Sequence, residues 1–207
     1  MPFDLWLAFV AASALLLFLP GPTILLVVGT ALGRGRAAGL ATVPGVVLGD
    51  FVAMTASLAG LGALLAASAT AFAVLKWIGV AYLVVLGIRM WRQTPADPSA
   101  PLDAVSHQKL GLHAFAVTAL NPKSIAFFVA FVPQFVEPST PLLAQLAILE
   151  VTFLALAGAN AAIYALLAGR LRRTIVRPTV LKTLNRVGGG GGALIGAGAL
   201  TATVSRS

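Results

Sequence analysis

Residues 5–31 read LWLAFVAASALLLFLPGPTILLVVGTA, an apolar stretch interrupted by Pro20-Gly21-Pro22. A helix needs roughly 20 mostly apolar residues to cross a bilayer, so this length predicts a membrane span. Each proline removes a backbone donor and clashes with the preceding turn, and Gly21 weakens the helix further. In hydrocarbon, the freed carbonyls must find partners in protein or in cavity water. The stretch therefore predicts a membrane protein whose first span is broken.

The composition of the whole chain supports a membrane protein. Of its 207 residues, 59% are apolar and only 10% are charged, and the mean hydropathy is +0.97. A soluble domain carries about 25% charged residues. The chain is thus neither a water-soluble enzyme nor a disordered protein. It contains no cysteine, which excludes disulfides, Cys-ligated metals and thiol redox chemistry.

Six apolar stretches are long enough to be spans: 5–31, 39–65, 72–88, 112–136, 142–168 and 180–203. The first has no basic residues before it and is too long for a signal-peptide core, so we do not expect it to be cleaved. A segment rich in Pro, Asp and Ser, 94–108, separates two groups of three spans. We predict an all-α integral membrane fold with six transmembrane helices and a single transmembrane domain over 1–207. Repeat one covers about 3–92, the linker about 93–110 and repeat two about 111–205.

The net charge of +8 follows the predicted topology. Three loops and their flanks hold eleven of the fourteen Lys and Arg residues: Arg34, Arg36, Arg89, Arg92, Lys109, Arg170, Arg172, Arg173, Arg177, Lys182 and Arg186. The positive-inside rule places these loops in the cytoplasm and both termini outside, in the periplasm of a bacterium. Contact with anionic lipid accounts for the rest of the charge pattern. No basic–aromatic surface is left to support nucleic-acid binding.

The two halves carry matching features and must cross the membrane in opposite senses. Pro22 and Pro122 are 100 positions apart, and so are Asp50 and Glu150. Proline-interrupted helices at corresponding positions of two inverted halves are typical of a transporter's binding site. The pattern predicts two inverted three-helix repeats.

Asp50 is the acid most deeply placed in a span. It comes about 12 residues into the second span, roughly 18 Å along a helix. An acid at this depth is unfavourable by about 2.5–3.5 kcal/mol, so it normally faces a cavity and serves function. We expect it to carry a proton or to bind an amine; a structural ion pair with Lys123 is the alternative.

The remaining candidate residues are polar groups near the two breaks and in the spans. The opened helix ends at Pro20, Gly21 and Pro22, and at Asn121, Pro122 and Lys123, should present amides and carbonyls to the carboxylate and ammonium of a small zwitterion.

Lys123 is the only basic residue well inside a span, and it could neutralise Asp50 or bind a substrate carboxylate. Glu150 lies nearer the outer face, where an interfacial position and a functional one are both open. Asn160 fits an interhelical hydrogen bond first. Tyr82 fits a core position that needs a partner for its hydroxyl.

Two glycine pairs have the small-xxx-small spacing of packed membrane helices. They are Gly45 with Gly49, and Gly192 with Gly196. We expect helix packing surfaces there, and such faces would also permit a homodimer. The glycine run 188–192 would let another backbone approach or let the last span bend.

Several catalytic and energy-coupling motifs are absent from the sequence. It has no H-E-x-x-H, no G-x-S-x-G and no Walker A motif, so we expect neither an enzyme nor an ATPase. His107 and His113 lie near the cytoplasmic side. We predict no cofactor and no metal site. We expect transport to be driven by a gradient or by a partner ATPase.

Several short motifs together resemble one known family. They are Pro20-Gly21-Pro22, the run Gly33-Arg34-Gly35-Arg36-Ala37-Ala38-Gly39, Gly49-Asp50, the run from Lys76 to Leu83 with Gly87, and Asn121-Pro122-Lys123 followed by Phe127-Phe128, Phe131 and Pro133-Gln134-Phe135. Over about residues 3–170, the chain resembles the LysE/RhtB family of bacterial amino-acid exporters.

The resemblance implies proton-driven efflux of amino acids such as lysine, homoserine, threonine or leucine across the bacterial inner membrane. It implies roles for Pro20, Gly21, Pro22, Asp50, Asn121, Pro122 and Lys123. Glu150 rests on the repeat pattern alone, and the glycine run in the last span is unusual for the family.

The sequence thus predicts a multi-pass secondary transporter in the lipid bilayer that exports a small amino acid or derivative by proton antiport. Its site would lie at the midplane between the first and fourth spans, with Asp50 as the acid and Lys123 as its partner, and one half would rock against the other. A metal-ion or other cation exporter of the same architecture is one alternative, although two acids are few ligands for a hard cation. A non-transporting membrane scaffold subunit is the other.

Overall fold

The computed structural model describes residues 1–68, 106–137 and 139–170, with scattered positions between 70 and 88. The elements in these three ranges are helices: α1 (Phe3–Phe18), α2 (Pro22–Arg34), α3 (Arg36–Ala41), α4 (Val43–Ala67), α6 (His107–Ala119), α7 (Pro122–Ala130), the short 3-10 helix η1 (Val132–Phe135) and α8 (Leu142–Arg170). The all-α prediction is confirmed for this part of the chain. Outside it lie most of the predicted span 72–88 with Tyr82, most of the linker, and the whole predicted span 180–203 with its glycine run and its glycine pair.

The described residues contain two long apolar helices and two bent helix pairs. Arg36–Gly60 and Leu142–Ala168 are each long and apolar enough to cross a membrane. The pair α1 and α2 bends by 53°, and the pair of α6 with Pro122–Phe135 bends by 44°. Counting each bent pair as one span gives four spans in this part of the chain. The six predicted spans are therefore found in part, and both predicted breaks are present.

Proline chemistry explains where both pairs break. Leu19 and Asn121 have extended backbones, with φ/ψ of −74°/114° and −72°/109°. Leu19 precedes Pro20 and Asn121 precedes Pro122, and the residue before a proline is pushed out of the helical region. Pro22 and Pro122 then open α2 and α7 at the first helical positions, where a missing N–H does no harm.

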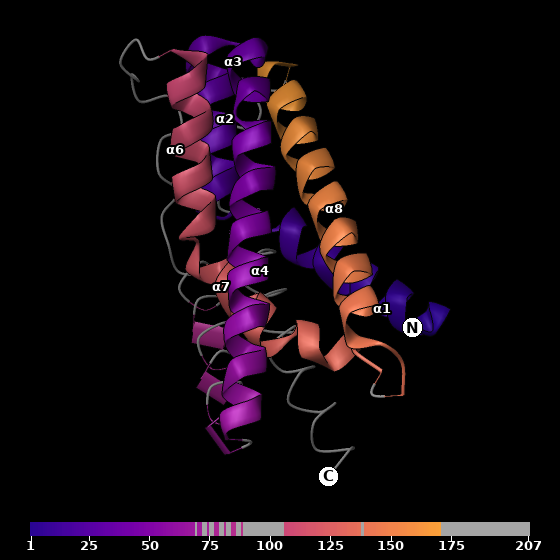
Figure 1. Ribbon diagram of the computed structural model, residues 1–207. Helices are drawn as coiled ribbons and strands as arrows, with labels where there is room; N and C mark the ends of the chain where they lie inside the picture. Colours follow the sequence, from indigo (N-terminus) through magenta and orange to yellow (C-terminus); the bar gives the residue numbers. More distant parts are fainter. Residues whose placement is uncertain are drawn as a thin grey trace.

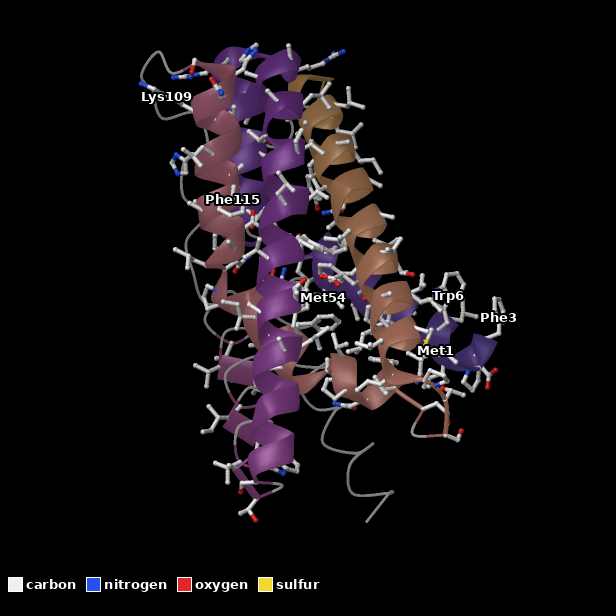
Figure 2. All side chains as sticks on the ribbon, viewed as in Figure 1. Met1, Phe3, Trp6, Met54, Lys109 and Phe115 are labelled. Carbon is white, nitrogen blue, oxygen red and sulfur yellow. The ribbon has the colours of Figure 1, made fainter. Side chains whose placement is uncertain are left out.

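The helices form a bundle in which α6 packs against α4 and α2, and α8 packs at an angle against α4 and α2 on the other side of α4 from α6 (Figure 1). The N-terminal helix α1 crosses at an angle and packs against α8. Figure 2 shows Lys109 at the end of the bundle where α3 lies, and Phe3 and Trp6 near the opposite half of α8. The Trp6 indole donates a hydrogen bond of 3.1 Å to the Thr152 hydroxyl, which ties the start of α1 to α8.

An aromatic cluster holds α7 in place. Phe127 stacks on Phe131 with ring centroids 5.3 Å apart, and Phe128 meets Phe153 of α8 edge-on at 4.9 Å. Phe9 of α1 packs edge-on against Phe135 of η1 at 5.4 Å. Aromatic pairs in these geometries add about 0.5–1.5 kcal/mol each beyond their area burial. The cluster therefore fixes α7 with Lys123 and Ser124 at its first turn.

The glycine pair of the second span packs α4 directly on the backbone of α6. A Cβ on Gly45 would overlap the carbonyl oxygen of Gly111, and a Cβ on Gly49 would lie 2.8 Å from the carbonyl oxygen of Phe115. The prediction of a helix packing surface is confirmed for this pair. Because α6 of the same chain fills the surface, it is not free for a second copy.

Replacing Gly45 with leucine should destabilise the protein, because the new side chain has no space between α4 and α6. Overpacking of a core costs about 1–3 kcal/mol, and the obstacle here is backbone. Gly60 on the same helix is the matched control, since a Cβ there meets nothing within 4 Å. Thermal unfolding of the detergent-solubilised protein should show a lower midpoint for Gly45→Leu and little change for Gly60→Leu. Equal midpoints in the two variants would contradict this packing.

Candidate transport site

Lys123 binds the broken end of the first span. Its ammonium nitrogen, Nζ, donates to the carbonyl oxygens of Leu16 at 2.8 Å and Leu19 at 2.7 Å. The last four carbonyls of a helix have no partners within that helix, and a cation at a helix C-terminus also gains from the helix dipole. Lys123 is itself buried, with 7% of its surface exposed. It therefore caps α1 from a helix more than 100 residues away in the chain.

Two side chains of α8 bind the carbonyls that lie between those two. The Asn160 amide donates to the Leu17 oxygen at 3.0 Å, and the Tyr164 hydroxyl donates to the Phe18 oxygen at 3.0 Å. Asn160 and Tyr164 are four residues apart, so they lie on one face of α8. The carbonyls of residues 16–19 thus all have hydrogen-bond partners within the protein, so none of them depends on water. The interhelical role predicted for Asn160 is confirmed, and sequence reasoning missed Tyr164.

A second set of hydrogen bonds joins the two breaks. Asn121 caps α7 by accepting from the backbone N–H of Lys123 at 3.1 Å, and its amide donates to the Thr23 hydroxyl of α2 at 3.2 Å. Thr118 of α6 donates to the same Thr23 oxygen at 3.2 Å. Asn121, Thr23 and Thr118 are all buried. The structure therefore brings the two proline breaks side by side, as the sequence predicted.

Asp50 lies beside the joined breaks with one oxygen unused. Its side chain is 3% exposed, and Ser124 of α7 is its hydrogen-bonding neighbour. Lys123 is the charged group that acts on Asp50 through space. Its Oδ1 has no hydrogen-bond partner among the residues that the structure describes. A buried carboxylate oxygen without a partner is unfavourable, so this oxygen is a candidate position for a hydrogen-bond donor.

A small cavity lies at this point, between α1, α2, α4, α7 and α8. Its volume is about 30 Å³, and the polar groups that line it include Gly21, Thr23, Asp50, Asn121, Lys123 and Asn160. A cavity needs about 10–15 Å³ to hold one water molecule, so this one has room for water and little more. Drug-sized ligands occupy pockets of about 300–1,000 Å³. In the described part of the chain, the space at the break is therefore too small for an amino acid.

Glu150 does not line this cavity. It is half-buried on α8 and accepts a hydrogen bond of 2.6 Å from the Thr55 hydroxyl of α4. The α8 residues that line the cavity, Ala157 and Asn160, follow it by about two turns or more. The structure thus places Asp50 and Glu150, the two acids of the predicted repeat, at different heights. Tyr82 lies outside the described residues.

The described residues contain no group of three or more His, Asp or Glu side chains that could hold a metal ion. In this part of the chain the cation-exporter alternative has no ligand cluster to support it.

Comparisons with known proteins identify a family of membrane translocators. Residues 14–202 match the LysE type translocator family. The chain is 36% identical over 198 residues to the homoserine/homoserine lactone efflux protein of Salmonella typhimurium, covering 95% of this chain and 96% of that protein. It is 32% identical over 204 residues to an uncharacterized membrane protein of Vibrio cholerae, covering 98% of each chain. A leucine efflux protein of Enterobacter sp. matches 63% of each chain at 32% identity. No solved structure matches the chain significantly.

Lys123→Met should destabilise the protein more than Tyr164→Phe does. The first change keeps the apolar stem but removes two hydrogen bonds from a charged group to the carbonyls of Leu16 and Leu19, and each such bond contributes about 1.5–3 kcal/mol. The second removes one neutral hydrogen bond, which averages about 0.6 kcal/mol between membrane helices. Unfolding free energies in mixed detergent micelles measure both. An equal or smaller loss in Lys123→Met would show that the ammonium does not hold the end of α1.

Proposed function

The chain belongs to the LysE type translocator family, and from this premise we propose that it exports a small amino acid or amino-acid derivative. The substrate would pass through the cavity at the two breaks. The named relatives support this substrate class, since they are efflux proteins for homoserine, homoserine lactone and leucine. The observation that carries the proposal is Asp50, an acid buried among membrane helices with an oxygen that has no partner in the described chain.

Transport is coupled to protons because the Asp50 carboxylate binds two cations in turn, a proton and the ammonium of the substrate. Asp50 binds either a proton or the ammonium of the substrate, and it cannot hold both at the same oxygen. Lys123 is the charged neighbour that acts on it, and its ammonium is held by the carbonyls of α1. A proton entering from outside therefore displaces the substrate, and a substrate entering from the cytoplasm displaces the proton. The outcome is antiport.

Transport requires the small cavity to widen and to open to each side in turn. The proposed motion is a rocking of one inverted three-helix repeat against the other about the two breaks. Pro22 and Pro122 support the repeat, because each opens the second half of a bent pair. The six-span, three-plus-three architecture is part of this proposal.

We place the protein in the bacterial inner membrane, with both termini on the periplasmic side. Arg36 and Lys109 support this orientation, because α3 and Lys109 lie at the same end of the bundle (Figure 2). Positive charge at one end marks the cytoplasmic side.

Counterflow in proteoliposomes tests the proposal. Vesicles containing the purified protein are loaded with unlabelled L-homoserine or L-leucine, and uptake of the labelled compound is followed. We expect uptake with the wild type and a decrease of about tenfold or more with Asp50→Asn, since a hydrogen bond to a charged group is lost. The change is isosteric and keeps a partner for Ser124.

Asp4→Asn is the matched control, because it makes the same carboxyl-to-amide change at an exposed residue near the start of α1. It should leave counterflow unchanged. Wild-type vesicles that exchange neither compound would contradict export of these amino acids. Equal counterflow in wild type and Asp50→Asn would remove Asp50 from the mechanism, and a scaffold subunit would show no counterflow in any variant.

A further inference from the structure

We infer that the substrate reaches Asp50 from the cytoplasmic end of the bundle along one face of α2, and that the Thr30 hydroxyl is a polar contact on this route. The inference rests on the proposed function and specifies the path of the exported compound. The route follows from the order of residues on four helices, from the small side chains between the cavity and α3, and from a buried hydroxyl without a partner.

The face of α2 that forms the route leads from the cavity toward α3. Thr23 lines the cavity, and Val27 and Thr30 follow it by four and seven residues, which places all three on one face of the helix. Thr30 therefore lies about 10 Å from Thr23 along the helix axis. The helix ends at Arg34, next to α3 in the chain. This is the end of the bundle that we place in the cytoplasm.

A layer of small apolar side chains lies between the cavity and Thr30. Four helices contribute to this layer, and its buried members form one cluster: Val27, Val46, Ala114, Ala161 and Ala165. Val46 also lines the cavity, one turn of α4 before Asp50. Valine and alanine side chains form no hydrogen bonds, so van der Waals contacts hold these side chains together. Separating the helices at this layer therefore breaks no hydrogen bond between its side chains.

The other side of the cavity is built from large side chains. There, on the side of the break opposite to α3, lies α7 (Figure 1), and Phe127, Phe128 and Phe153 are fully buried. Ser13 of α1 also has a buried hydroxyl without a partner among the described residues, but it shares its helix face with Phe9 of the same aromatic core. Passage on that side displaces large rings, whereas passage on the α3 side separates only small side chains.

Thr30 supplies a polar group beyond the layer of small side chains. Its side chain is 0% exposed, and its Oγ1 has no hydrogen-bond partner among the residues that the structure describes. A threonine hydroxyl within a helix commonly bonds a carbonyl one turn earlier, and a buried hydroxyl without any bond is unfavourable. Because a hydroxyl both donates and accepts, it can bind an ammonium, a carbonyl or a water molecule. Thr30 thus offers a crossing substrate a polar contact between the cytoplasm and Asp50.

Single cysteines test the route without background labelling, since the sequence contains no cysteine. Thr30→Cys and Ala31→Cys are a matched pair: both residues are buried, but Ala31 lies on another face of α2 and packs against Gly39 of α3. Each variant in lipid vesicles is treated on both sides with a small methanethiosulfonate that carries a primary ammonium, and mass spectrometry follows the modification. We expect Thr30→Cys to react at least about tenfold faster than Ala31→Cys, because its thiol faces the route.

Val27→Cys and Val28→Cys repeat the comparison nearer the cavity, which keeps the inference testable if Thr30→Cys does not fold. The two valines are 0% and 5% exposed. Val27 belongs to the layer of small side chains, whereas Val28 packs in a separate cluster with Ala168 of α8. Val27→Cys should react at least about tenfold faster than Val28→Cys. Equal rates within either folded pair would overturn the inference.

Counterflow after labelling separates the inference from the proposed function. Modified Thr30→Cys should exchange L-homoserine or L-leucine at least about tenfold more slowly than the unmodified variant, because the attached group fills the route. Ala31→Cys should keep its counterflow after the same treatment. Full modification of Thr30→Cys without loss of counterflow would overturn the inference, since the substrate would then take another path. Wild-type vesicles that exchange neither compound would overturn the proposed function alone, because the labelling rates do not depend on transport.

Discussion

A helix that breaks inside a membrane must find partners for the carbonyls at its broken end, because hydrocarbon offers none. In this protein the carbonyls of residues 16–19 receive hydrogen bonds from Lys123, Asn160 and Tyr164. The donors come from α7 and α8, so the break in the first span is held by the second half of the chain. The placing of α1 against α7 and α8 depends on this set of bonds.

The same bonds decide the chemistry of the cavity. The one buried lysine of the described chain binds the end of α1, and Oδ1 of Asp50 has no hydrogen-bond partner among the described residues. The cavity thus holds an acceptor without a partner next to a cation that binds the end of α1. In the proposed mechanism, the substrate ammonium and the proton bind the same oxygen of Asp50. Movement of the substrate is therefore coupled to movement of the proton.

Much of this arrangement could be predicted from the sequence, since it depends on local rules. Prolines predicted both breaks, the depth of Asp50 and Lys123 in the spans predicted the site, and the spacing of Gly45 and Gly49 predicted close helix packing. The partners of Lys123 could not be predicted, because they are backbone carbonyls that carry no sequence signal. Glu150 shows the opposite limit: its spacing matches that of Asp50, yet its partner is Thr55 and it lies outside the cavity. The i, i+4 spacing of Asn160 and Tyr164 was a signal that could have found Tyr164.

The contact between Lys123 and the end of α1 is open to direct measurement by solid-state NMR in lipid bilayers. Protein labelled with ¹⁵N at lysine Nζ and ¹³C at leucine carbonyls should show dipolar coupling between a lysine nitrogen and leucine carbonyl carbons, and Lys123→Met should abolish it. Wild-type protein without this coupling, or a coupling that survives in Lys123→Met, would contradict the account, because the first span would then be held open by some other group.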